Sequence, residues 1–95
     1  MDLNKSLRLA IDTGKVSVGA NQSSKAITSG SAKLVIISSN CPDETVATAK
    51  KGETPVYSFK GNNSVLGAAC GKPFPVSIIA ILDGGKSDIL SLKAN

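Results

Sequence analysis

The stretch GANQSSKAITSGSAKLVIIS, residues 19–38, carries the pattern that decides the fold. A glycine at its start is followed by a helix predicted over residues 21–29, which Gly30 ends. The continuous apolar run at 34–37 is rich in β-branched residues, which is typical of a central strand buried on both faces. This order predicts a sheet with a helix packed against it.

Helical and β patterns continue to alternate on both sides of this stretch. The predicted elements are a helix that ends at Gly14, a helix from Pro42 or Asp43 to Lys51 and Gly52, a helix over 64–70, and strands over 15–19, 56–59 and 76–82. The tail at 87–92 is predicted to form either a short helix or an edge strand. The alternation predicts an α/β fold with a mixed or parallel sheet between helical layers.

Length and composition predict one domain over residues 1–95. Hydrophobic residues make up 41% of the chain and aromatic residues only 3%, so aliphatic side chains must fill a single core. Lysine and arginine total 11 against 7 aspartate and glutamate residues, which gives a net charge of +4. This excess favours an anionic partner, although an ordinary solvated surface can have the same composition.

The chain lacks the side chains that several classes of function need. The chain has no histidine and only two cysteines, so it offers neither an ordinary Cys/His zinc site nor a nucleophile with a histidine base. The turn at 84–87 resembles the end of a phosphate-binding loop, but Ala80 stands where that loop needs a glycine. We therefore predict no enzyme activity, no metal and no cofactor.

The cysteines and the apolar runs indicate a cellular compartment. We expect Cys41 and Cys70 to be small buried residues in a reducing environment, with a disulfide between them as the alternative. No apolar run of the signal-peptide type stands at the start, and none reaches the ~18 residues of a spanning helix. These features predict a cytosolic protein with no membrane partner.

Polar groups gather at the start of the helix predicted over 21–29. Gly19 would let a nucleic-acid backbone approach closely, and the amides of Asn21 and Gln22 can bind base edges. Lys25 lies one turn further on and would meet a phosphate or a guanine edge. In the alternative, Asn21 caps the helix, and Gln22 and Lys25 are solvated polar positions.

The segment 71–75 is a second candidate, because it holds Phe74 between two prolines and close to Lys72. A ring held between Pro73 and Pro75 in a loop has few ways to bury itself in a domain this small, so it would offer a stacking surface to an unpaired base. In the alternative, Phe74 folds back onto the core.

Positions along nearly the whole chain match one known family. The matching residues are 12–16, Gly19, 30–37, Asn40, Pro42, 55–57, 66–67, 70–74, 82–83 and 87–90. Together they resemble the thirty-e family of archaeal and eukaryotic large-subunit ribosomal proteins, within the wider family of kink-turn RNA binders.

The resemblance implies a three-layer α/β/α sandwich with a mixed four-stranded sheet that binds a kinked RNA helix. In this reading the second helix enters the groove at tandem G·A pairs, and neighbouring loops hold an extruded nucleotide. The implied RNA-binding residues are Gly19, Asn21, Gln22, Lys25, Asn40, Lys72, Pro73 and Phe74. The implied partners are large-subunit ribosomal RNA and neighbouring ribosomal proteins in the cytoplasm, and the protein would be a monomer outside the ribosome.

Two other functions are compatible with the same residues. A kink-turn-binding subunit of a guide ribonucleoprotein or of ribonuclease P would use the Asn21 and Gln22 pair in the same way. A protein-interaction adaptor would instead use the Phe74 loop and the C-terminal tail as its docking surface.

Overall fold

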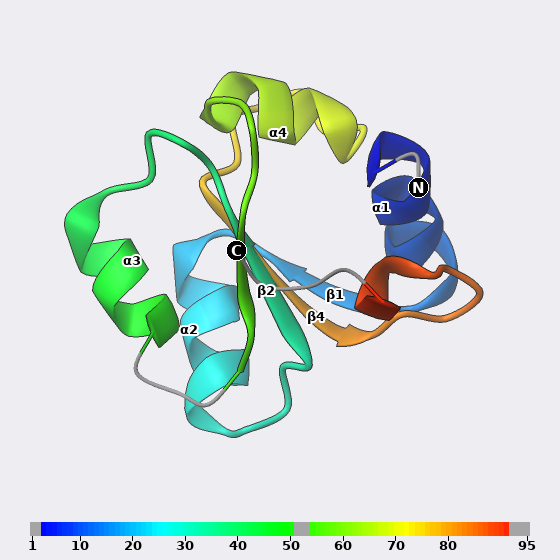
Figure 1. Cartoon of the computed structure of the whole chain (residues 1–95), viewed down its shortest axis with the longest axis horizontal. Helices are drawn as coiled ribbons and strands as arrows, with labels where there is room; N and C mark the ends of the chain where they lie inside the picture. The colour runs from blue at the N-terminus through cyan, green and yellow to red at the C-terminus, as the bar shows by residue number, and fades with distance from the viewer. Residues whose placement is uncertain (1–2, 51–53, 92–95) are drawn as a thin grey trace.

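The computed structural model describes residues 3–50 and 54–91, in which helices and strands alternate (Figure 1). Their order is α1 (Leu3–Thr13), β1 (Lys15–Val18), α2 (Ala20–Thr28), β2 (Leu34–Ile37), α3 (Asp43–Lys50), β3 (Val56–Ser58), α4 (Asn63–Ala69), β4 (Ile78–Asp83) and η1 (Ile89–Ser91), a 3₁₀ helix. The four strands form a sheet in the order β1-β4-β2-β3. Since β4 runs antiparallel to β1 and β2 while β3 runs parallel to β2, the predicted mixed sheet is confirmed.

Alternate side chains of β2 pack against two different helical layers. Leu34 and Ile36 belong to a core cluster with side chains of α1 and α4. Val35 and Ile37 pack instead with side chains of α2 and α3. Successive side chains of a strand point to opposite faces, so a strand buried on both faces needs a helical layer on each. Figure 1 shows these two layers on opposite sides of the sheet, which confirms the α/β/α sandwich.

Glycines stand at both ends of α2. Gly19 is the N-cap residue with a φ of 95°, and Gly30 follows the helix with a φ of 76° and donates its N–H to the carbonyl of Ile27 at 3.1 Å. Both φ values lie in the left-handed region that favours glycine. The helix begins at Ala20, one residue earlier than predicted, and no side chain caps it. The alternative in which Asn21 caps the helix is therefore wrong.

Strands β1, β3 and β4 do not fill their predicted ranges; β1 ends at Val18, one residue early. β3 ends at Ser58, although the following residue, Phe59, is buried and still donates its N–H to the carbonyl of Ile37 in β2 at 2.8 Å. β4 begins two residues later than predicted, and Val76 donates its N–H to the carbonyl of Asn63 in α4 at 2.9 Å. The chain before β4 is thus bonded to a helix at Val76 and to the end of β2 at Ser77.

The C-terminal segment follows the helical alternative. Residues Ile89–Ser91 form a single 3₁₀ turn, and Ile89 is buried against the α1 and α4 side of the core. Position 92, like Lys51 and Gly52 at the predicted end of α3, lies outside the described residues.

The two cysteines are not bonded to each other, so the disulfide alternative is wrong. Cys70 is buried in the α1 and α4 cluster, as predicted, and burial raises the pKa of its thiol to about 11 although Lys72 partly opposes the shift. Cys41 is only half-buried and packs against the α2 and α3 cluster, so the prediction of a buried residue holds for it only in part. Partial burial also raises the pKa of the Cys41 thiol, so both thiols stay protonated at neutral pH.

Candidate nucleic-acid interface

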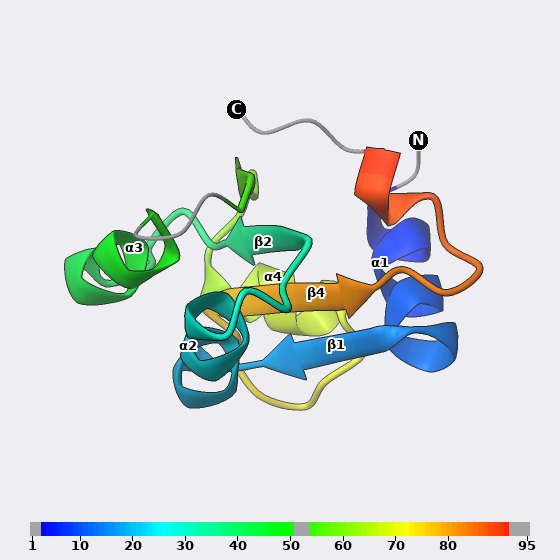
Figure 2. The same ribbon diagram turned by 90° about the horizontal axis from the view of Figure 1, so that it is seen from below.

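Three segments meet at one end of the strands of the sheet because of the strand directions. β1 and β2 both run antiparallel to β4, so the residues that follow β1 and β2 lie beside those that precede β4. Gly19 donates its N–H to the carbonyl of Ile78 at 3.0 Å, and Ser38 donates to Ser77 at 2.9 Å. In Figures 1 and 2, the start of α2 lies next to the start of β4. We call this end of the sheet, marked by Gly19, Ser38 and Ser77, the α2 edge.

The amino end of α2 presents its polar residues to solvent. Asn21 and Gln22 in its first turn are exposed, whereas Ser23 is buried and donates its hydroxyl to the carbonyl of Ser17 at 3.2 Å. Lys25 is also exposed, but it lies in the last turn of this helix and not at its amino end. A helix amino end carries partial positive charge from its aligned N–H groups. This end of α2 therefore offers backbone N–H and side-chain amide groups to an anionic ligand, and Lys25 adds a cation further along the helix.

A groove of about 380 Å³ opens at the α2 edge, between the junction of β1 with α2, the start of α3 and the loop before β4. It is lined by Val18, Gly19, Pro42, Thr45, Lys72, Phe74, Pro75, Val76 and Ser77. Its walls are mainly apolar, with the Lys72 side chain as a cationic group. This composition suits a flat apolar base that remains attached to a phosphate.

Phe74 forms a wall of this groove and is 51% exposed. The alternative in which its ring folds back onto the core is therefore wrong; Phe59, the other phenylalanine, is the buried one. A second groove of about 320 Å³ lies between the same loop and α4 and is lined by Ser64, Ala68, Lys72, Pro73, Phe74 and Pro75. Phe74 thus lines both grooves.

Asn40 lies in the loop after β2, and its side-chain amide joins that loop to the start of α4. Its Oδ1 accepts the backbone N–H of Asn63 at 2.8 Å and the hydroxyl of Ser38 at 3.0 Å. Its Nδ2 donates to Oδ1 of Asn63 at 3.3 Å. The amide already serves three intramolecular bonds, so Asn40 holds the loop after β2 against the start of α4.

The structure brings most of the predicted site residues to the α2 edge, but these residues do not all line the same groove. Gly19, Lys72 and Phe74 line the first groove, while Pro73 lines only the second. Asn21, Gln22 and Lys25 lie on the exposed face of α2 and line neither of these grooves. The sequence analysis missed Thr45 as a groove residue, because a lone threonine within a helix carries no signal.

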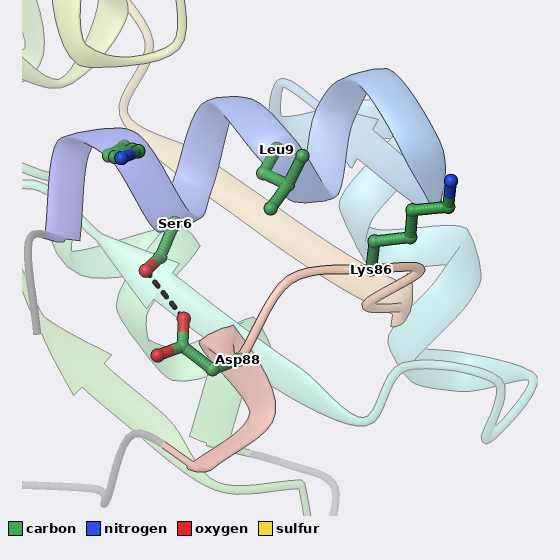
Figure 3. A pocket seen from close by; sticks show the side chains of 5 residues that line it. Ser6, Leu9, Lys86 and Asp88 are labelled. Atoms are coloured by element: carbon green, nitrogen blue, oxygen red, sulfur yellow. Dashed lines mark hydrogen bonds between the residues drawn. The ribbon is translucent and has the colours of Figure 1, made fainter.

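Another hollow, of about 420 Å³, is lined by Lys5, Ser6, Leu9, Lys86 and Asp88 (Figure 3). It lies between α1 and the loop after β4, and Figure 3 shows the Ser6 hydroxyl directed at the Asp88 carboxylate, with the two oxygens 2.6 Å apart. Lys5 and Lys86 stand against the Asp88 carboxylate in this lining, so its charge does not exclude a phosphate, but none of the residues that line it is aromatic. This hollow therefore lacks a stacking surface of the kind that Phe74 offers at the α2 edge.

The docking surface expected of an adaptor is divided in the structure. Leu90 of the tail is exposed, but it follows the carboxyl end of β4, whereas the Phe74 loop precedes its amino end. The strand has six residues, which corresponds to roughly 20 Å. The two apolar groups therefore do not form a continuous surface.

Residues 3–50 and 54–91 offer neither a metal site nor a membrane-spanning helix. No group of three or more His, Cys, Asp or Glu side chains there is placed to hold a metal ion. The helices of that part of the chain lack the length and apolar character needed to cross a bilayer.

Known proteins resemble the chain over nearly its full length. The model of the Ribosomal protein L7Ae/L30e/S12e/Gadd45 family matches residues 1–91. The large ribosomal subunit protein eL30 of Methanospirillum hungatei is 50% identical over 93 residues, 97% of this chain and 98% of that protein. The eL30 of Methanoregula boonei is 48% identical, with 98% and 97% covered, and that of Methanosarcina mazei 44%, with 99% and 91% covered. The resemblance seen in the sequence is confirmed, and the chain belongs to the Ribosomal protein L7Ae/L30e/S12e/Gadd45 family.

Proposed function

We propose that the protein is a structural constituent of the large ribosomal subunit that binds a kinked element of ribosomal RNA, without catalysis. The observation that carries the proposal is the α2 edge, where an exposed polar helix start lies beside a groove walled by Phe74 and Lys72. The eL30 names of the archaeal relatives support the ribosomal role. In this proposal residues 1–95 act as one RNA-binding domain, a monomer outside the ribosome.

Each part of the α2 edge has a distinct task in this proposal. The start of α2 enters the opened groove of the kinked helix, where Asn21 and Gln22 bind base edges and Lys25 neutralises a phosphate. Gly19 lets the RNA backbone approach, since the space beside its Cα holds no other atom within 4 Å. An extruded base stacks on Phe74 and contributes about 1–3 kcal/mol.

Asn40, Lys72 and Pro73 complete the proposed interface. Lys72 lines both grooves and would pair with the phosphate of the extruded nucleotide. Asn40 acts by holding the loop after β2 against α4, and its exposed edge faces the RNA from that position. Pro73 restricts the backbone of the loop that presents the ring.

Binding to a kink-turn RNA, compared with the same RNA carrying Watson–Crick pairs in place of the tandem G·A pairs, tests the proposal. We expect tighter binding to the kinked RNA by at least tenfold at 150 mM salt. Equal affinity for both RNAs, with a steep loss in salt, would mean that the contact is electrostatic and unspecific, and the proposal would fail.

A guide ribonucleoprotein or ribonuclease P subunit is the second candidate function, because the Asn21 and Gln22 amides suit any kink-turn. Sedimentation of the cell extract after a high-salt wash separates the two. We expect the protein to remain with large ribosomal subunits. Recovery with small guide-RNA particles would favour the second candidate.

A further inference from the structure

We propose that Gly67 of α4 is a positioning residue, which sets the place of the Phe74 ring by letting the loop before β4 lie directly on the helix. The inference rests on the proposed function, in which that ring stacks on an extruded base. It concerns a residue that touches no RNA and acts through the backbone of Phe74.

Gly67 is buried in a helix interior, where glycine is less stable than alanine. Its backbone φ does not require glycine, because Gly67 is not among the residues with a positive φ. A Cβ atom at this position would clash with the carbonyl oxygen of Phe74 and lie 3.2 Å from its carbonyl carbon and 3.3 Å from Cα of Pro75. All three are backbone atoms, so no flexible side chain can move aside. The close approach of the loop accounts for the glycine.

Hydrogen bonds to α4 hold the loop on both sides of this contact. The N–H of Lys72 donates to the carbonyl of Gly67 at 3.0 Å, and the N–H of Gly71 donates to Ala68 at 3.0 Å. Beyond the ring, Val76 donates to Asn63 at 2.9 Å. The backbone of Phe74 is therefore fixed between two anchored points while its side chain stays half-exposed.

A side chain at position 67 would lift the loop away from α4. Lys72, Phe74 and Pro75 line both grooves, so the same displacement would change the width of each. The Phe74 ring would remain exposed, but it would be displaced from its position in the wall of the groove at the α2 edge. A binding site loses affinity for its ligand when its groups are no longer preorganised, because binding must then order them.

The test combines Gly67→Ala and Phe74→Ala in a double-mutant cycle of kink-turn RNA affinity. We expect each single variant to bind at least fivefold more weakly than wild type, and the double variant to bind within about twofold of Phe74→Ala. Additive losses would show that position 67 acts independently of the ring and would overturn the proposal. Ala10→Gly, which weakens the same core cluster from α1, is the matched stability control and should bind like wild type.

A readout without RNA separates this proposal from the proposed function. The chain has two phenylalanines, so incorporation of 4-fluorophenylalanine gives one ¹⁹F resonance for buried Phe59 and one for exposed Phe74. Gly67→Ala should move the Phe74 resonance and leave that of Phe59 in place. Unmoved resonances in a folded variant would overturn the inference. A moved resonance in a protein that does not select kinked RNA would refute the proposed function alone.

Gly67→Ala can also fail to fold, and a second variant covers that outcome. Ligation at Cys70 allows a synthetic segment 70–95 in which an ester replaces the amide between Gly71 and Lys72. This change removes the Lys72 N–H bond to Gly67 without adding volume. We expect a moved Phe74 resonance and weaker RNA binding, and wild-type values for both would overturn the proposal.

Discussion

Two exposed side chains of the candidate interface, Lys25 and Asn40, differ in their bonds within the protein. Lys25 is exposed on α2, whereas Asn40 already uses its amide in bonds to Ser38 and Asn63. Loss of Lys25 therefore removes a group that is available to a ligand. Loss of Asn40 also releases the loop after β2 from the start of α4, so a binding defect there has two causes.

Lys25→Ala should weaken kink-turn binding about fivefold and lower the salt slope of the affinity by about one, because it removes one phosphate contact. The fold should be unaffected, since the side chain is exposed. Fluorescence anisotropy across a salt series measures both quantities. Lys15→Ala removes the same charge at the far end of β1 and should have little effect; equal losses in the two variants would contradict a specific role for Lys25.

Phe74→Ala should lower RNA affinity by about 1–3 kcal/mol, the contribution of one stacked base. Its melting temperature should stay close to that of wild type, because the ring is half-exposed. Calorimetry of binding and thermal unfolding of the same sample give the two values. A melting temperature lower by several degrees with unchanged affinity would assign the ring to the core.

At the scale of elements, caps and glycines account for where the helices begin and end. The N-cap residue of α2 is Gly19, which has no side chain to cap the helix, whereas the N-cap residue of α4 is Asn62, whose Oδ1 accepts the N–H of Val65 at 3.0 Å. The start of α4 also receives the Asn40 bonds, and its body supports the Phe74 loop. The stability of this short helix is therefore coupled to the interface.

Asn62→Ala should lower the free energy of unfolding by about 1 kcal/mol, because the N–H of Val65 loses its acceptor. Urea titration at neutral pH measures this loss. Asn62→Asp keeps a side-chain acceptor and should retain most of the stability. A loss in the aspartate variant as large as in the alanine variant would argue against capping.

At the scale of the whole molecule, the sheet brings together segments that are distant in the chain. Residues 19, 38–40 and 72–77 meet only because β4 lies between β1 and β2 and runs against both. The core on the α1 and α4 side includes Val76 from one of these segments, and Cys70 is buried within the same core. Titration of that thiol therefore affects global stability.

Stability should fall as the pH rises from about 9 to about 11. Burial raises the pKa of Cys70 from 9.0 to about 11, so between these values the unfolded chain releases its proton while the folded chain retains it. The loss should reach about 1–3 kcal/mol and be absent below about pH 8. Urea unfolding of wild type and Cys70→Ala across this range measures the difference. The same pH slope in both proteins would exclude Cys70 as its cause.

The sequence by itself determined the alternation of elements, the two buried faces of β2 and the breaks at Gly14 and Gly30. Apolar periodicity and glycine conformation are local properties, and they fix element type before any packing occurs. It also indicated Gly19, Lys72 and Phe74 as site residues, but it left open whether the ring was buried.

Only the tertiary structure decided that the Phe74 ring is exposed, which bonds Asn40 makes, and that the loop contacts Gly67. Each depends on segments that approach through the sheet, and no local pattern encodes such an approach. In the sequence, a glycine within a helix indicates only lower helix stability. In the structure, the carbonyl of Phe74 occupies the space that a side chain at position 67 would need.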